Sequence, residues 1–378
     1  MAGLAQTGTP GGEVALLLDI GTTEFLEYFS TEVLDELVSS GGAACRFFEG
    51  AFGAGKTHLL SLLHSLAVAR GMAVVRVDLS HALSLEDWPA ITRYILEKLE
   101  LVVDGRREVS LPRILEALAR NGTAETTRLA ATSLPHGGFA RAMRLMASDP
   151  LPNNAAFEAL QAYLLGEPVT QATLRAAGIR GVRGALGNRS AELVLRTVVN
   201  GLRALGVAGT VLLFDEAERA FRVRGGHVTQ KVVAAANLMR RFIDACTTGG
   251  LSGVLAVFAV LPGFVDDCAL AYDALGQRLT LMPDDEYGRI AWRSPVLPIE
   301  RLTTLPDRAA FLTATCERMT TLAARCGLDE NVEDTLRREL LHHGRLALEG
   351  EAGSGYRRGL MKRVATVCLS HLSPSPTA

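Results

Sequence analysis

The chain has 378 residues, of which 48% are hydrophobic and 21% are charged, and its formal net charge is −2 at pH 7. This much apolar material is ample for a sizeable buried core, so we expect a folded globular protein of two or three domains. A net charge near zero excludes a general affinity for nucleic acids or acidic membranes, and any such binding must use local patches.

Cysteine and histidine spacing argues against a metal site or a disulfide framework. The eight histidines form no His-x-x-x-His or His-Glu-x-x-His pattern, which disfavours a metalloenzyme. The six cysteines form no Cys-x-x-Cys pair, which favours reduced thiols in a cytoplasmic protein: Cys45, Cys246, Cys268, Cys316, Cys326 and Cys368. The apolar run Val14–Leu18 is too short for a signal peptide.

The first part of the chain alternates between helical and strand-like patterns. Residues 1–12 are rich in Gly, Thr and Pro, and we expect them to be disordered. Helical spacing over 23–38 is followed by strand-like runs at 46–49 and 72–79, with a helix over 57–70 between them. Ser84 and Asp87 predict a capping box for the next helix.

The second part begins with a helical block over about 109–205, which reads as an insertion. Strand-like runs return at 210–214, 254–261 and, more weakly, 295–299, and only helical patterns follow Thr303. Strands that alternate with helices indicate an α/β fold with a mainly parallel sheet.

One segment needs a separate test, because residues 245–265 carry no charge and are long enough to span a bilayer. Its first half contains Thr, Gly and Ser, and only 254–261 is densely apolar before Pro262 and Gly263. Eight such residues are more typical of a strand that is buried on both faces, so we expect no membrane association.

Residues 50–57, Gly-Ala-Phe-Gly-Ala-Gly-Lys-Thr, match the pattern G-x-x-x-x-G-K-[ST] between a predicted strand and a predicted helix. The glycines let backbone N–H groups surround a phosphate, and the helix directs its positive dipole end at the same anion. A glycine-rich turn that binds nothing is the alternative. We predict an ATP site, with Lys56 on the β and γ phosphates, formed by Gly50, Ala51, Phe52, Gly53, Ala54, Gly55, Lys56, Thr57 and His58.

The run "TVLLFDEAE" supplies a second, acidic element, because its four apolar residues lead to Asp215 and Glu216. We predict that Thr57 and Asp215 hold Mg²⁺, and that Glu216 polarises the water that attacks the γ phosphate. An acidic loop after a core strand is the alternative. The glutamate favours ATP hydrolysis over kinase or GTPase chemistry.

Together, these motifs resemble the additional-strand P-loop ATPases of the AAA+ and STAND kind, near the origin-recognition branch. Within them, the chain resembles the bacterial BrxD family of ATP-binding proteins in BREX phage-exclusion systems. The resemblance covers roughly residues 15–365 and rests on "FFEGAFGAGKTHLL", "AFEALQAYLLGEP", "TLRAAGI", "GVAGTVLLFDEAE" and "AANLMRRFID".

The resemblance implies a P-loop ATPase core over 13–302, with a five-stranded parallel sheet of order 5-1-4-3-2 and the helical insertion. It also implies a helical lid over 303–370, followed by a tail over 371–378. In this family a polar sensor residue, usually threonine, ends the fourth strand, where this chain has Leu261 before Pro262. Because leucine cannot hydrogen-bond a water or a phosphate, slow turnover is expected.

Three arginines lie where the resemblance implies contacts with a nucleotide. Arg278, in "LGQRL", is the expected finger toward a neighbouring subunit, and a surface arginine is the alternative. In "GSGYRRGLMKR", Arg357 or Arg358 is the expected second sensor, and we assign Arg358 to the site. The proline that the family has before this arginine is replaced by Tyr356.

A group of arginines after Asp215 could follow a DNA backbone, although a solvated helix face is the commoner explanation: Arg219, Arg222, Arg224, Arg240 and Arg241. The resemblance implies a homo-oligomer, partners such as a helicase, and DNA as a candidate partner. The first functional hypothesis is an ATPase of phage defence whose nucleotide state controls assembly. A replication initiator or helicase loader, and a nucleotide-gated scaffold with little turnover, are the alternatives.

Overall fold

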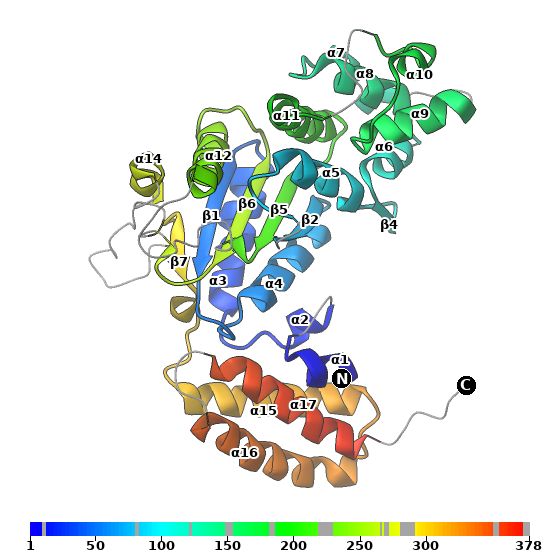
Figure 1. The fold of residues 1–378 in the computed structure, drawn as a ribbon. Coiled ribbons are helices and arrows are strands. Elements are labelled where there is room, and N and C mark those ends of the chain that lie inside the picture. The colour runs from blue at the N-terminus through cyan, green and yellow to red at the C-terminus, as the bar shows by residue number, and fades with distance from the viewer. Residues whose placement is uncertain are drawn as a thin grey trace.

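The computed structural model describes residues 1–9, 13–79, 83–120, 123–147, 154–180, 186–217, 230–264, 267, 272–279, 292–350 and 355–372. Figure 1 shows a central sheet between helices, with a block of helices beyond one end and a bundle of C-terminal helices beyond the other. The N-terminus lies beside this bundle, although the bundle belongs to the last part of the chain.

The sheet has seven strands in the order β4-β3-β2-β5-β6-β1-β7. Strands β2, β5, β6, β1 and β7 pair in parallel, and numbered among themselves along the chain they lie in the order 5-1-4-3-2. The strands are β1 (Ala43–Glu49), β2 (Ala73–Asp78), β3 (Glu100–Val103), β4 (Arg106–Val109), β5 (Thr210–Asp215), β6 (Val254–Val260) and β7 (Val296–Pro298).

The prediction of a purely parallel, five-stranded sheet was incomplete, because β3 and β4 extend the β2 edge as an antiparallel pair. Asp104 and Gly105 join these strands with positive φ angles of 51° and 75°. An Asp-Gly pair is a strong signal for a two-residue hairpin turn, and the sequence analysis overlooked it because each strand has only four residues.

Side chains that alternate along the strands enter two separate cores. Phe48, Val74, Leu213 and Val257 pack on one face with α4 (Lys56–Ala69), α3 (Thr23–Tyr28) and the π-helical η1 (Phe29–Val38). Phe47, Val75, Leu212 and Phe258 pack on the other face with α5 (Trp88–Lys98), α11 (Asn188–Ala204) and α12 (Gln230–Thr247). The segment 23–38, which we predicted as one helix, forms α3 and continues directly as the π-helical η1.

The helix after β2 begins three residues later than the capping-box prediction placed it. Asp87 is the N-cap of α5, and its carboxylate accepts a 3.0 Å hydrogen bond from the backbone N–H of Ala90. Pro89 lies in the first turn, where a missing N–H costs nothing, so Asp87 rather than Ser84 starts the helix.

The predicted insertion is helical, and it follows the β3–β4 hairpin. Its helices pack together and onto α5 through the same core that covers one face of the sheet. They are α6 (Leu111–Ala119), α7 (Thr123–Ala131), α8 (Gly137–Met146), α9 (Asn154–Leu164), α10 (Gln171–Ala176) and the long α11.

The C-terminal bundle consists of α15 (Arg308–Arg325), α16 (Glu333–Glu349) and α17 (Tyr356–His371), with its own core. The N-terminal residues, which we expected to be disordered, contain the helix α1 (Ala2–Thr7), which packs on α17. Leu4 is buried in the bundle core, and Met1 and Ala5 pack against the same core.

The uncharged segment that could have spanned a bilayer contains β6, all of whose residues are buried in the sheet. Among the described residues, no helix has both the length and the apolar character needed to cross a membrane. The short connections between the remaining elements are α2 (Glu13–Leu17), α14 (Asp273–Gly276), η3 (Gln277–Leu279), η4 (Ile299–Leu302) and η5 (Glu330–Val332).

Three aromatic rings stack across the middle of the sheet. Phe258 of β6 lies between Phe47 of β1 and Phe214 of β5, with ring-centroid distances of 5.1 and 4.5 Å and interplanar angles of 13° and 7°. We predict that Phe258→Ala lowers the free energy of unfolding by about 3–5 kcal/mol, because it leaves a cavity between the two flanking rings.

Urea unfolding followed by circular dichroism would measure this change. The matched control is Leu346→Ala, at a side chain on α16 that is 47% exposed, where a change within about 0.5 kcal/mol is expected. Equal effects of the two substitutions would contradict the role of the stack.

Candidate functional site

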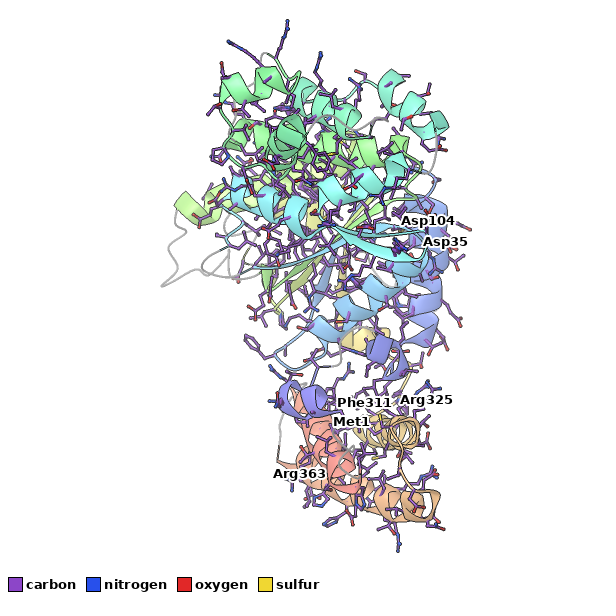
Figure 2. All side chains as sticks on the ribbon, turned by 90° about the vertical axis from the view of Figure 1, so that its right-hand side faces the viewer. Met1, Asp35, Asp104, Phe311, Arg325 and Arg363 are labelled. Atoms are coloured by element: carbon purple, nitrogen blue, oxygen red, sulfur yellow. The ribbon has the colours of Figure 1, made fainter. Side chains whose placement is uncertain are left out.

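A pocket of about 180 Å³ lies at the carboxyl ends of the parallel strands, between the sheet and the C-terminal bundle. The loop after β1, the end of β5 and the start of α17 line it together with the N-terminal segment. In Figure 2 the bundle, with Phe311 labelled, lies below the layer of strands and helices, and Phe311 is one of the lining residues. The pocket therefore joins three parts of the chain.

The phosphate-binding loop predicted from the sequence begins where β1 ends. Gly50 donates a 3.0 Å hydrogen bond from its backbone N–H to the carbonyl of Val260, which fixes the loop to the end of β6. Gly53 and Gly55 have φ angles of 77° and 105°, in the left-handed region that favours glycine. The helix α4 starts immediately afterwards, at Lys56, and its N-terminus faces the loop.

Lys56 is held at the mouth of this loop. Its side chain is buried, and Nζ donates hydrogen bonds of 2.6 Å to the carbonyl of Gly50 and 3.2 Å to that of Ala51. The ammonium also lies 5.4 Å from the ring centroid of Phe52, which is 64% exposed. These contacts place a positive charge beside the backbone amides of the loop, which is the arrangement that a polyphosphate needs.

Thr57 and Asp215, which are 158 residues apart in the sequence, are in direct contact. The Thr57 hydroxyl donates a 2.9 Å hydrogen bond to Oδ2 of Asp215, whose side chain is buried. Oδ1 of Asp215 accepts a 3.1 Å hydrogen bond from the backbone N–H of Glu216. A hydroxyl and a carboxylate oxygen side by side are a donor pair suited to Mg²⁺, so the residues present fit the predicted ion.

Arg76 is a site residue that the sequence analysis missed. It lies in the middle of β2, and its Nη2 donates a 2.9 Å hydrogen bond to the same Oδ2 of Asp215. Its Nη1 reaches the hydroxyl of Ser61 on α4, at 3.2 Å. The guanidinium thus compensates a buried carboxylate, and an arginine inside the otherwise apolar run "MAVVRVDL" was the available signal.

Glu216 follows β5 and lines the pocket beside Asp215. Its φ angle is 56°, which is uncommon for a residue other than glycine. This conformation turns the chain sharply at the end of the strand. The side chains of Asp215 and Glu216 therefore do not follow the alternation between the two faces of the sheet that residues within a strand show. Such a turn is typical of residues whose position is set by function.

The two arginines at the start of α17 have different partners. Arg357 donates a 3.2 Å hydrogen bond to the carbonyl of Ala54 in the loop, and its guanidinium lies 5.0 Å from the Phe311 ring centroid. Arg358, which we assigned to the site, lines the pocket but donates to the carbonyl of Thr7, at 3.0 Å. The arginine that contacts the phosphate-binding loop is therefore Arg357.

Arg278 is not among the residues that line this pocket. Its guanidinium donates to both carboxylate oxygens of Asp244 on α12, at 2.5 and 3.3 Å, and to the carbonyl of Ala274, at 2.6 Å. The structure therefore does not bring Arg278 to this chain's own site, and its predicted reach toward a second subunit stays a prediction.

Leu261 directly follows β6, whose last residue Val260 pairs with Glu49 at the end of β1. The expected sensor position thus lies near the start of the loop, but Leu261 itself is not among the lining residues.

The basic group after Asp215 is only partly described. Arg241 forms an ion pair with Glu192, and Arg240 lies 3.9 Å from Asp244 and over the ring of Tyr272. Both arginines thus already face carboxylates of this chain, which favours the solvated-face interpretation for them. Arg219, Arg222 and Arg224 lie outside the described residues.

The far wall of the pocket comes from segments that the sequence analysis did not connect with the site. It is mainly apolar, and its residues come from the N-terminal segment, α4, η4 and α17: Leu18, Ile20, Leu62, Ile299, Leu302 and Met361. Asp19 in the same wall is buried and accepts hydrogen bonds from the hydroxyls of Thr22 and Thr23. Only tertiary packing brings these residues to the loop, so no local pattern marks them.

His58 lies on α4 between the phosphate-binding loop and this apolar wall. The pKa of His58 is lowered to about 4, mainly by burial and also by the positive charge of Arg357, while the Asp19 carboxylate and a hydrogen bond with the Leu18 backbone act in the opposite direction. The imidazole is therefore neutral at pH 7. Among the described residues, its buried Nδ1 has no hydrogen-bond partner.

This pKa predicts a pH dependence of stability in the nucleotide-free protein. Because the folded pKa of about 4 lies below the ordinary value of 6.5, the unfolded chain binds this proton more readily. The contribution is complete above pH 6.5 and is lost as the pH falls toward 4. Urea unfolding at pH 7.5 and at pH 5 should show a larger loss for the wild type than for His58→Asn.

The control is His342→Asn on α16, because the His342 side chain is exposed and is not among the residues that line the pocket. This variant should behave like the wild type. An equal loss of stability in the wild type and in His58→Asn would contradict the buried, neutral state of His58.

A comparison with known protein families identifies the family of this chain. The family described as "BREX system ATP-binding protein BrxC/D" matches residues 12–143 and 126–357, which include the loop, the acidic pair and the start of α17. A search of curated proteins and a search of solved structures gave no significant match. The chain belongs to the BrxC/D family of BREX system ATP-binding proteins.

Proposed function

We propose that this chain is a Mg²⁺-dependent ATPase, with its catalytic site in the pocket between the sheet and the C-terminal bundle. The observation that carries the proposal is the 2.9 Å hydrogen bond between Thr57 and Asp215. It joins the two elements that an ATPase of this kind requires, and it does so at a pocket that also contains Lys56 and Glu216. The family description supports ATP as the nucleotide.

Each residue has a distinct role in the proposed reaction. The backbone amides of the loop and Lys56 bind the β and γ phosphates, and Thr57 and Asp215 hold the Mg²⁺ ion, which neutralises charge on the phosphates. Glu216 orients the attacking water and accepts its proton. Arg76 keeps the Asp215 carboxylate turned toward Thr57.

Slow turnover fits the chain better than fast turnover. Leu261, at the position that the resemblance assigns to a polar sensor, offers no hydrogen bond to the water or the γ phosphate. A scaffold that binds ATP with little hydrolysis is therefore the second candidate. Glu216 favours hydrolysis, because a scaffold needs no carboxylate beside the metal-binding aspartate.

The biological role that we propose is phage exclusion by a cytoplasmic protein of the BrxD type within the family. The bundle touches the loop through Arg357, so a change in the loop on ATP binding or hydrolysis reaches the bundle directly. This contact supports a nucleotide state that controls assembly with copies of the chain, with Arg278 between subunits, and with other defence proteins such as a helicase. DNA is a further candidate partner.

Lys56→Ala is expected to weaken ATP binding at least about tenfold, because it removes a charge-assisted contact with the phosphates. Isothermal titration with Mg-ATP would measure the affinity, and a thermal melt would show that the variant is folded. Lys98→Ala, at an exposed lysine that pairs with Glu97 on α5, is the matched control with unchanged affinity. Undiminished affinity in Lys56→Ala would refute the site.

Glu216→Gln is expected to bind ATP like the wild type while its turnover falls at least about 100-fold, the usual range for the loss of a general base. Phosphate release under saturating Mg-ATP is the measurement, with the exposed Glu97→Gln as the control. An unchanged rate would contradict the role of Glu216. Tight ATP binding without measurable turnover in the wild type would instead support the scaffold.

A further inference from the structure

The helical insertion has a net charge that differs in sign from that of the rest of the chain. Residues 109–205 contain eleven arginines, no lysine and six acidic residues, which gives a formal net charge of +5. Because the whole chain has a net charge of −2, the remainder of the chain carries −7. Such an asymmetry within one chain favours an acidic partner for the basic part.

The arginines of the insertion differ in whether the fold already neutralises or binds them. Several donate to glutamates one turn away or to backbone carbonyls: Arg120, Arg128, Arg144, Arg196 and Arg203. By contrast, Arg141, Arg175 and Arg180 are exposed, and within the described part of the chain their side chains form no ion pair or hydrogen bond. We call these three residues the arginine cluster.

The arginine cluster lies at one corner of the insertion. Arg141 belongs to α8, Arg175 lies in the last turn of α10, and Arg180 follows that helix. A guanidinium nitrogen of Arg141 lies 4.0 Å from the position that a Cβ on Gly178, between the two other arginines, would occupy. Leu174 of α10 is buried in the core, which leaves the adjacent Arg175 on the outer side of the helix.

This corner points away from the rest of the molecule. Figure 1 places α8 and α10 in the helical block at the opposite end from the C-terminal bundle. In Figure 2, side chains with nitrogen at their tips extend outward from the same end. A large partner can therefore reach the arginine cluster without contact with the pocket.

The surface around the arginine cluster decides which acidic partner fits it. Among the described residues of the insertion, no aromatic side chain is exposed, and Leu193 is the only large aliphatic one that is. Single-stranded nucleic acids stack their bases on exposed aromatic rings, and protein partners bury an apolar centre. The phosphates of a duplex require neither, because guanidinium groups bind them directly. Duplex RNA is usually recognised through its 2′-hydroxyls as well, which favours DNA for a surface of guanidinium groups.

We propose that the arginine cluster binds the phosphate backbone of double-stranded DNA. The inference gives a surface to the DNA partner of the proposed function, and it rests on that part of the proposed function alone. It also moves the expected contact away from the arginines after Asp215, of which Arg240 and Arg241 already face carboxylates. Because contacts with phosphates do not depend on the bases, we expect binding without sequence preference.

The test measures the fluorescence anisotropy of a labelled DNA duplex of about 20 base pairs, without nucleotide, in about 50 to 200 mM salt. The single strand and an RNA duplex of the same sequence are the comparison ligands. The cluster variant is Arg141→Gln/Arg175→Gln/Arg180→Gln, since glutamine keeps a long polar side chain and a good helix propensity. Arg175→Gln alone is a second, milder variant, and thermal melts show that each protein is folded.

The matched control is Arg318→Gln/Arg325→Gln/Arg345→Gln. These three arginines are exposed on the C-terminal bundle, so the control has the same net charge as the cluster variant but an intact arginine cluster.

The wild type should bind the DNA duplex more tightly than the single strand or the RNA duplex. The slope of log affinity against log salt should be shallower by about 2–3 in the cluster variant, because each lost phosphate contact removes roughly 0.9 of the slope. Its affinity at the lowest salt should fall at least about tenfold. Arg175→Gln should lower the slope by about 0.9, and the control should match the wild type. Mg-ATP affinity should be unchanged in every variant, since the cluster does not line the pocket.

Several results would overturn the inference. A wild type that does not bind the DNA duplex, or wild-type affinity in both cluster variants, would reject the surface. An equal loss in the control would assign the binding to the overall charge of the protein. Tighter binding of the single strand or the RNA duplex would assign a different nucleic acid. Because the DNA titrations contain no nucleotide, a failure of the ATP site would appear only in the Mg-ATP titration of the wild type.

Discussion

The contact between Thr57 and Asp215 is the interaction on which the rest of the site depends. It requires β1 and β5 to end at the same edge of the sheet, and β6 between them keeps the two strands at a fixed separation. The residues that surround the contact act on the same carboxylate, since Arg76 and the backbone of Glu216 both donate to it. The sheet order thus sets the geometry of the candidate site as well as the packing of the core.

The C-terminal bundle is part of the site rather than an appendage. Arg357 bonds to the loop, Met361 belongs to the apolar wall, and α1 joins the two ends of the chain on the surface of α17. One pocket therefore contacts the first, middle and last parts of the sequence. A ligand that fills the pocket would contact all three parts, so its binding would stabilise their packing against one another.

Local chemistry made the loop, the acidic pair and the buried strands predictable from the sequence. The glycines at 53 and 55 are required by positive φ angles, and the apolar run before Asp215 is a strand buried on both faces. The β3–β4 hairpin, Arg76 and the N-terminal helix were missed for different reasons. Short strands carry little periodicity, a single arginine in a strand has no pattern, and α1 is ordered by a distant helix rather than by its own sequence.

The site residues likewise divide into those that a local motif predicts and those that only tertiary packing brings to the site. Thr57 and Asp215 belong to recognisable motifs, whereas Arg357 and Arg358 are adjacent on one helix and only the packing around them shows that Arg357 contacts Ala54 and Arg358 contacts Thr7. The assignment of Arg358 as the second sensor stays a prediction. The apolar wall could not be predicted, since its members come from four elements and share no spacing. The BrxC/D family description supports ATP, the nucleotide already predicted from the sequence, whereas the geometry alone leaves the nucleotide open.

Because the bundle lies close to the loop, Gly53 and Gly55 are restricted by different parts of the structure. A Cβ at Gly55 would meet nothing within 4 Å, so only its backbone angle restricts that position. A Cβ at Gly53 would lie 2.5 Å from the carbonyl oxygen of Gly355, so the neighbouring helix restricts it as well. Position 53 is therefore restricted both by its backbone angle and by the bundle, although it belongs to a motif that is usually explained by phosphate binding alone. A shortened chain that ended before α17 would lose the restriction from the bundle and keep the one from the backbone angle.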